Sequence, residues 1–276
     1  MIENSNNGIK YLSFESLNNL TIVKNAFSTR LGGVSTGFYS SMNLGFANGD
    51  DKEKVSQNFV LFAEACGFEL DHIVRTKQTH TTNIHIVSDE DVYNDGILHD
   101  PDYTDIDGLV CNIPGVVLCT SYADCVPLYF VDPVRKVIGL SHSGWRGTVS
   151  RMGEKTVKTM SDTFGSDPAD IFTAIGPSIC QDCYEVSSDV AEEFITEFKI
   201  DNVDSSKLLS RGKEPGKYQL NLWECNKKVL LDAGITKDHI ECADLCTCCH
   251  SDYLFSHRAS GGKRGNLCAF LMLNKN

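Results

Sequence analysis

The most constraining feature of the sequence is a series of strand-like segments joined by turns that are too short to hold a helix. Between residues 107 and 142 the chain reads DGLVCN, VVLCTSY, PLYFV and KVIGLSH, with IPG and DPVR as turns. Tight turns join antiparallel strands, because a parallel pair needs a crossover of a dozen or more residues. Strand-like and helix-like segments are interspersed elsewhere. We therefore predict a mixed α/β (α+β) fold, with a central mixed sheet flanked by helices.

Helical periodicity predicts several helices around this region. Residues 50–66 carry apolar side chains on one face, with Asp50 or Asp51 as the cap and Gly67 as the stop. Loops are expected at 88–107, which is acidic, and at 201–218. No repeat or linker interrupts the chain, so we expect a single domain over residues 1–276. Further helices are expected at TVSRMGEKTVKTMSDTF, SSDVAEEFITEF and LNLWECNKKVLLDAG, and further strands at HIVRT, TNIHIV, DIFTAIG, HIECA and LCAFLMLN.

The charge balance restricts the classes of partner. The formal net charge is -12, with 37 acidic against 25 basic residues, which argues against nucleic acid or an anionic membrane as a partner. A small anionic substrate needs only a local basic pocket and stays compatible with this charge. No segment is apolar enough to span a membrane, and the N-terminus lacks the features of a signal peptide. We expect a cytoplasmic protein whose 12 cysteines are thiols or metal ligands rather than disulfides.

Polar residues end three of the strand-like segments. KQTH ends on His80, SYADC on Cys125 and LSH on His142. If PLYFV and KVIGL form an antiparallel hairpin around DPVR, Cys125 and His142 lie at the same open end of that hairpin.

The spacing leaves three interpretations of these residues open. A lone Cys or His is most often a buried, satisfied core residue. One thiolate and two imidazoles would instead give a metal ion three protein ligands and leave a fourth position open, as in catalytic zinc sites. In the third interpretation, the histidine takes the thiol proton and Cys125 acts as a nucleophile without metal.

Several ordered motifs resemble those of one known family. FSTRLGGVSTGFYSSMNLG, KQTH, DGLV, SYADCVPLYF, SHSGWRG, AIGPSICQDCYEV and LFSHRASGGKRGNLCAFL run through nearly the whole chain. They are similar to motifs of the YfiH-like family, also called laccase-domain or polyphenol oxidase proteins. Its members are described as purine nucleoside phosphorylases and as peptidoglycan editing factors.

The resemblance implies a metal site and an activity. In that family the residues at the positions of His80, Cys125 and His142 bind a catalytic zinc ion (Zn2+). The implied fold is a single mixed α/β domain with a core similar to that of toxin deamidases. The implied reaction is cleavage of adenosine, inosine or methylthioadenosine by phosphate to the base and ribose 1-phosphate, with deamination of adenosine as a second activity. Water activated by zinc suits this deamination, since the ion lowers the pKa of water to about 7.

Two other activities are compatible with the same resemblance. One is a hydrolase that edits wrongly incorporated amino acids in peptidoglycan precursors at the same site. The other is a copper-dependent polyphenol oxidase, which the sequence disfavours, because its eight histidines contain no His-x-His pair for a multi-copper cluster. Copper remains an alternative occupant of the site.

Arginines and glycines in the motifs suggest where phosphate binds. We expect Arg30 and Arg146, and with less support Arg258, to contact phosphate, because guanidinium groups match its oxygens. An ordinary structural ion pair is the alternative for each of these residues. Glycines beside Arg30 and Arg146 would let the backbone approach an anion closely.

Three further polar residues are candidates for the site. Asp124, next to Cys125, would orient a ligand histidine or carry a proton. Gln78 lies two residues before His80 and would face the substrate if the segment is extended. Asn43 would bind ribose or order its own loop.

The cysteine-rich segment ECADLCTCCHSDYLFSH has the composition of a second metal site. We interpret the spacing of its cysteines as different from C-x-x-C, and we therefore expect no structural zinc site in this segment. Cys180 and Cys183 do form a C-x-x-C motif, but no second pair is assigned to it. Redox chemistry is one alternative for Cys180 and Cys183, and we expect them instead to pack within a turn.

Overall fold

The computed structural model describes residues 1–92, 97 and 100–275, and it contains two six-stranded mixed sheets. In sheet A the order is β1 (Ile2–Asn6), β2 (Ile9–Ser13), β3 (Val23–Ser28), β15 (Leu267–Leu273), β7 (Val117–Tyr122) and β4 (Ile73–Arg75). In sheet B it is β14 (Ile240–Cys242), β10 (Phe172–Ile175), β8 (Val126–Asp132), β9 (Val137–Ser143), β6 (Gly108–Cys111) and β5 (Ile84–Ile86). The mixed class is confirmed, with its strands distributed over two large sheets rather than one.

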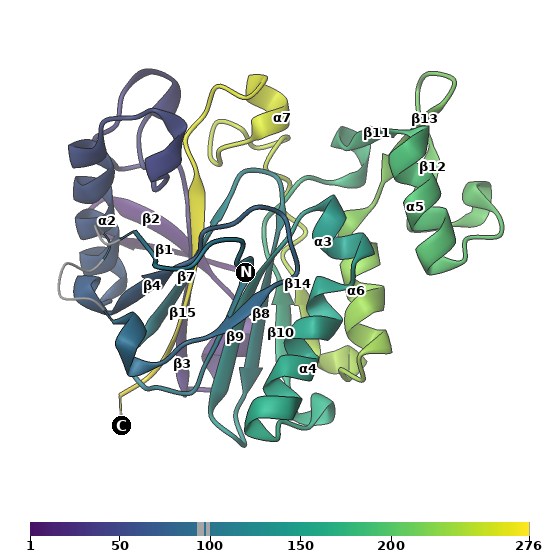
Figure 1. The fold of residues 1–276 in the computed structure, drawn as a ribbon. Coiled ribbons are helices and arrows are strands. Elements are labelled where there is room, and N and C mark those ends of the chain that lie inside the picture. The colour runs from purple at the N-terminus through teal and green to yellow at the C-terminus, as the bar shows by residue number, and fades with distance from the viewer. Residues whose placement is uncertain (93–96, 98–99, 276) are drawn as a thin grey trace.

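The two sheets pack between helices (Figure 1). Along β8, Tyr129 and Val131 point into the core shared by the two sheets. Leu128 and Phe130 alternate to the other face, where they pack in a core that includes side chains of α4 (Met152–Phe164) and α6 (Leu222–Asp232). The outer face of sheet A packs on α2 (Lys52–Cys66). The layers therefore run helix, sheet, sheet, helix.

Smaller elements surround these layers. A three-stranded sheet of β11 (Glu185–Ser187), β13 (Lys217–Leu220) and β12 (Leu209–Arg211) lies beside α5 (Ser188–Phe198) at the upper right of Figure 1. The strands β12 and β13 occupy part of the region predicted as a polar loop. The remaining α-helices among the described residues are α1 (Glu15–Asn19), α3 (Trp145–Val149) and α7 (His257–Ser260).

The predicted hairpin is confirmed. Strands β8 and β9 pair antiparallel, and Pro127 lies opposite His142. Cys125, directly before β8, therefore lies beside the end of β9, as the length of the DPVR turn predicts. The boundaries of α2 are also confirmed, because the Asp51 side chain accepts a hydrogen bond from the N–H of Glu53 and Gly67 ends the helix in the left-handed conformation.

The helix expected after Gly147 differs from the prediction. It begins earlier, as α3 at Trp145, and it is interrupted before α4 begins at Met152. Arg151 adopts a left-handed conformation with φ of 61° and separates the two helices. Its guanidinium pairs with Glu154, Glu197 and Asp232, and these contacts hold the interruption in place.

The predicted acidic loop at 88–107 is described in part. It contains a short 3-10 helix, Asp89–Asp91, while residues 93–96 and 98–99 lie outside the described residues. Within the described chain, no helix has the length and apolar character needed to cross a membrane.

Candidate metal centre and its cavity

The two histidines and the cysteine predicted from the sequence come together. His80 lies in the loop between β4 and β5, Cys125 lies just before β8, and His142 lies in β9. The ligand atoms of the three residues lie within 4.8 Å of one another. The Cys125 Sγ is 4.0 Å from the His80 Nε2. The imidazoles of His80 and His142 meet nearly edge to face, with ring centroids 5.0 Å apart.

The buried carboxylate of Asp107, which was not predicted from the sequence, orients both histidines. Asp107, directly before β6, accepts a hydrogen bond from the Nδ1 of His142 at 2.8 Å and one from the backbone N–H of His80 at 3.1 Å. Its other oxygen accepts the backbone N–H groups of Thr79 and Thr81. These bonds hold His80 in its left-handed conformation, with φ of 66°. Since Nδ1 of His142 is bonded to Asp107, its Nε2 is the nitrogen that can bind a metal ion.

The charges of this cluster depend on one another. Burial would raise the pKa of Asp107, but the hydrogen bond and charge of His142 and the backbone N–H groups lower it to about 2. Burial would also raise the pKa of Cys125, but His142 and His80 lower it to about 6. Burial would lower the pKa of His142, but Cys125 and Asp107 raise it to about 9. Cys125 therefore favours the thiolate form, which is the form that binds metal ions, whereas the protonated His142 has to release a proton when a metal ion binds.

Gly144 gives the cluster the space it needs. A Cβ atom at this position would lie 3.0 Å from the Sγ of Cys125 and 3.2 Å from the Cδ2 of His80. A side chain here would therefore require these two donors to shift by a few tenths of an ångström. The sequence SHSGWRG predicts a close approach of the backbone here, and the structure identifies the groups that it approaches.

The donor set fits zinc. Zinc bonds of about 2.3 Å to sulfur and about 2.0 Å to nitrogen place tetrahedral ligand atoms about 3.6 Å apart. The separation of 4.0 Å between Cys125 and His80 needs only a small closure to reach this value. His142 is buried whereas His80 is exposed, so the fourth position would face the open side of the cluster.

The open side leads into a cavity of about 330 Å³. Phe46, Gln78, Tyr122, Arg264 and Asn266 line this cavity together with the three candidate ligands. Arg264 was not predicted from the sequence, because one arginine within GGKRGN carries no distinguishing signal. Its Nε is buried and has no hydrogen-bond partner within the described part of the chain, whereas its Nη1 donates to Asn266. Burial lowers the pKa of Arg264, so an anion bound in the cavity would stabilise its charge.

Gln78 and Asn43 are engaged with the backbone. Gln78 lines the cavity, but its amide group accepts the N–H of Ser121 at 2.7 Å and donates to the carbonyl of Ser121 at 2.9 Å. Asn43 is fully buried, and its side chain bonds Gly45, Asp50 and the N–H of Asn266. These bonds match the loop-ordering alternative predicted for Asn43.

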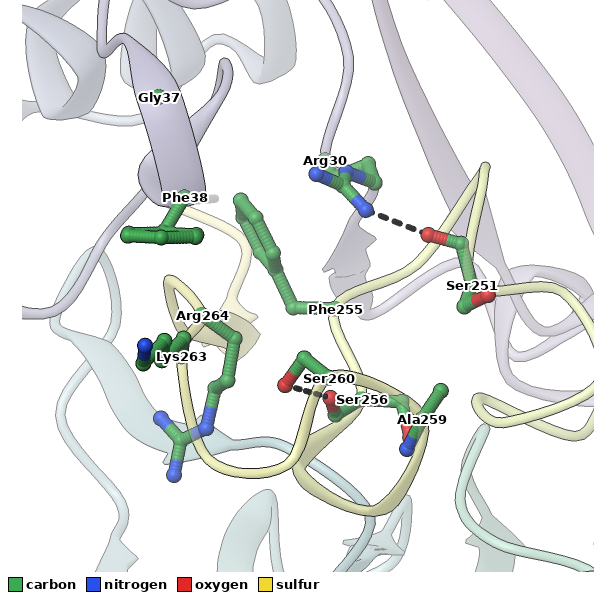
Figure 2. Close-up of a pocket in the computed structure, with 10 residues that line it drawn as sticks. All are labelled: Arg30, Gly37, Phe38, Ser251, Phe255, Ser256, Ala259, Ser260, Lys263 and Arg264. Carbon is green, nitrogen blue, oxygen red and sulfur yellow. Dashed lines mark hydrogen bonds between the residues drawn. The ribbon is translucent and has the colours of Figure 1, made fainter.

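The three arginines expected at the phosphate lie outside this cavity. Arg30 donates to the carbonyls of Ser40 and Ser251 (Figure 2) and lines a neighbouring cavity of about 300 Å³, which Arg264 also lines. In Figure 2 the guanidinium of Arg264 extends away from Arg30. Arg146 is exposed and stacks on Trp145, with 4.2 Å between the guanidinium carbon and the ring centroid. Arg258 donates to the carbonyls of Cys183 and Glu185.

Asp124 does not contact the ligand histidines in the described structure. Its carboxylate accepts the Thr247 hydroxyl at 2.6 Å and the backbone N–H of Arg258 at 2.7 Å. Asp107 occupies the orienting position instead. The position of Asp107 directly before the DGLV strand is the sequence feature that could have identified it. That strand, β6, pairs with β9, which contains His142.

The interpretation of the cysteine-rich segment is corrected. Cys246 and Cys249 are separated by two residues and do form a C-x-x-C motif. The structure brings them to Cys180 and Cys183, with all four sulfur atoms within 4.8 Å of one another.

Comparison with known proteins places the chain in a family. Residues 24–274 match the family model described as multi-copper polyphenol oxidoreductase laccase. A Bacteroides thetaiotaomicron protein named purine nucleoside phosphorylase is 34% identical over 266 residues, covering 96% of this chain and 97% of that protein. Adenosine deaminase RL5, from an unknown prokaryotic organism, is 33% identical over 241 residues, covering 87% of this chain and 90% of that protein.

The fold agrees with this comparison. The crystal structure of the Bacillus licheniformis protein YfiH superposes with a TM-score of 0.88 at 33% identity, covering 99% of both chains. The chain therefore belongs to the multi-copper polyphenol oxidoreductase laccase family, the YfiH-like group that its sequence motifs predict.

Proposed function

We propose that this chain is a zinc-dependent purine nucleoside phosphorylase that also deaminates adenosine. The observation that carries the proposal is the convergence of His80, Cys125 and His142 at the wall of a cavity that the half-buried Arg264 also lines. The names of the relatives from Bacteroides thetaiotaomicron and of RL5 support the two reactions.

In this proposal His80, Cys125 and His142 hold the metal ion. When bound, zinc supplies a Lewis acid and lowers the pKa of water to about 7. One thiolate with two imidazoles suits zinc, while copper would compete for the same donors if it were available. Asp107 holds the imidazole of His142 so that Nε2 faces the site, and it fixes the backbone of His80.

Arg264 is the proposed phosphate contact, in place of the arginines expected from the sequence. Its guanidinium lines the cavity and offers charge-assisted hydrogen bonds to a phosphate oxygen. In phosphorolysis, a phosphate oxygen forms a bond to C1′ of the ribose as the bond from C1′ to the purine nitrogen breaks. The base departs with that electron pair, and ribose 1-phosphate remains. The partly buried Phe46 offers an apolar wall for the nucleoside.

The test is incubation of the purified protein with adenosine, with and without phosphate, followed by chromatography. We expect adenine and ribose 1-phosphate only when phosphate is present, and inosine in both cases. His80→Ala and Cys125→Ala should abolish the products and remove the zinc ion that these residues hold, whereas His72→Ala, on the surface beside Glu69, should leave both unchanged.

A different outcome would favour the alternative activity. Release of serine from a peptidoglycan precursor, with no turnover of adenosine or inosine, would replace the proposal by a hydrolase at the same site. Turnover of adenosine that survives Cys125→Ala would show that the reaction takes place elsewhere on the protein.

A further inference from the structure

A second cluster of cysteines lies apart from the candidate metal centre. It consists of two C-x-x-C pairs, Cys180 with Cys183 and Cys246 with Cys249. In the chain, Cys246 follows Cys183 by 63 residues. The Sγ atoms of Cys183 and Cys249 are 3.4 Å apart, and those of Cys180 and Cys249 are 4.0 Å apart. All four sulfur atoms lie within 4.8 Å of one another.

These separations match tetrahedral coordination by thiolates. Zn–S bonds of about 2.3 Å place the sulfur atoms of a site with four cysteine ligands about 3.8 Å apart. A disulfide would bring a pair of them to about 2.0 Å. The spacing C-x-x-C with a distant second C-x-x-C is also the pattern of structural zinc sites.

The backbone around the cluster is arranged to stabilise thiolates. The N–H groups of Cys180 and Cys249 both donate to the Sγ of Cys246, each at 3.3 Å. Cys246 is buried, whereas Cys249 is exposed, so an ion can reach the cluster from solvent.

We propose that Cys180, Cys183, Cys246 and Cys249 form a structural zinc site, separate from the candidate centre at His80, Cys125 and His142. Four protein ligands close the coordination sphere and leave no position for a substrate, which distinguishes the site from a catalytic one. The inference does not depend on the proposed function, because it concerns other residues and another role.

The site joins two loops that have little regular structure of their own. One follows β10 and carries the 3-10 helix Gln181–Cys183, and the other follows β14. An isolated bridge between Ser178 and Cys246 and a few backbone hydrogen bonds connect the loops. A zinc ion bound by both loops would add a strong cross-link to these weak contacts.

The second loop also reaches the candidate metal centre. Thr247, between the ligands Cys246 and Cys249, donates its hydroxyl to the Asp124 carboxylate at 2.6 Å. Asp124 precedes Cys125 and adopts a left-handed conformation with φ of 85°. The proposed zinc therefore anchors the loop that holds this turn beside Cys125.

The test begins with the zinc content of the purified full-length protein and its variants, measured by elemental analysis. We expect one zinc ion for each of the two clusters in the wild type. Cys183→Ser/Cys249→Ser should lose one of the two ions and Cys125→Ala the other. The double variant is needed because Cys248 also lies close to Cys183 and would be available to replace a single lost thiolate. Cys242→Ser, in the same segment but outside the cluster, should retain both ions.

A second measurement does not require the double variant to fold. Cys125→Ala protein, in which the candidate metal centre is disabled, is stripped of metal and reconstituted with Co2+. We expect intense thiolate-to-cobalt charge-transfer absorption together with the visible bands of a tetrahedral tetrathiolate complex. Octahedral cobalt without thiolate bands would overturn the proposal. Detection of disulfides among the four cysteines by mass spectrometry without reduction, with no second zinc ion in the wild type, would overturn it as well.

Discussion

One carboxylate oxygen of Asp107 contacts both candidate histidine ligands: it accepts the Nδ1 proton of His142 at 2.8 Å and the backbone N–H of His80 at 3.1 Å. The two histidines come from different parts of the chain, and a single buried carboxylate oxygen of Asp107 is hydrogen-bonded to both. The orientation of the metal donors therefore depends on a residue that would not itself touch the metal.

Asp107→Asn should weaken metal binding without removing a ligand. An amide cannot accept all the hydrogen bonds that converge on the carboxylate, and it does not compensate the charge of His142. We expect the zinc affinity of the His80 centre to fall by about 10- to 100-fold, as for other residues that support metal ligands. Competition with a chromophoric chelator measures the affinity. Asp105→Asn, an exposed neighbour, is the control, and equal affinities for the two variants would contradict the prediction.

Gly144→Ala should disturb the same centre by a steric effect alone. The added methyl group would lie 3.0 Å from the Sγ of Cys125, closer than carbon and sulfur normally approach. We expect the zinc ion of the His80 centre to be lost while the far-ultraviolet circular dichroism spectrum stays that of the wild type. Gly147→Ala is the matched control, because its methyl group would lie 3.4 Å or more from its neighbours. Retention of the ion in Gly144→Ala would refute the steric argument.

Arg264→Gln should raise the KM for phosphate. The variant keeps a polar side chain but loses the charge that the cavity offers to an anion, and a charge-assisted hydrogen bond contributes about 1.5–3 kcal/mol. We expect the KM for phosphate to rise by at least about 10-fold, measured from phosphorolysis rates at varied phosphate concentration. Arg146→Gln, on the exposed stacked arginine, should leave it unchanged. A raised KM for phosphate in Arg146→Gln, with an unchanged KM in Arg264→Gln, would instead identify Arg146 as the phosphate contact.

The ion-pair cluster of Arg151 should make stability depend on pH. Burial would raise the pKa of Asp232, but its bonds with Arg151 and Lys228 lower it. A carboxylate whose pKa is depressed by folding stabilises the protein above the unfolded-state pKa of about 4, and this contribution is lost as the pH falls through the folded-state pKa.

Asp232→Asn should accordingly destabilise the protein at pH 7 by up to about 1 kcal/mol, since the carboxylate is partly exposed. The difference from the wild type should shrink at about pH 3. Urea denaturation at both pH values measures it. Asp162→Asn, in an exposed pair with Lys158, is the control and should change little. A difference that persists unchanged at low pH would show that the effect is not electrostatic.

Local patterns explain the parts of the site that could be predicted. A turn as short as DPVR favours an antiparallel hairpin, which predicts that Cys125 and His142 lie at one end of β8 and β9. The equally short IPG turn instead connects β6 of sheet B to β7 of sheet A. The family motifs added His80. The arginines were harder to place, because every arginine in a motif offers the same charge and only packing decides which one faces the cavity.

The mixed α/β class, the hairpin and the ends of α2 could be predicted, since each depends on residues that are close together in the chain. The remaining features depend on contacts between segments that are far apart in the chain. Asp107 reaches His142 because β6 pairs with β9, placing Gly108 opposite Ser141. Strands β10 and β14 run parallel in sheet B, with Ile175 beside Cys242. Parallel strands end at the same edge of a sheet, and the loops that follow them therefore bring the two C-x-x-C pairs together.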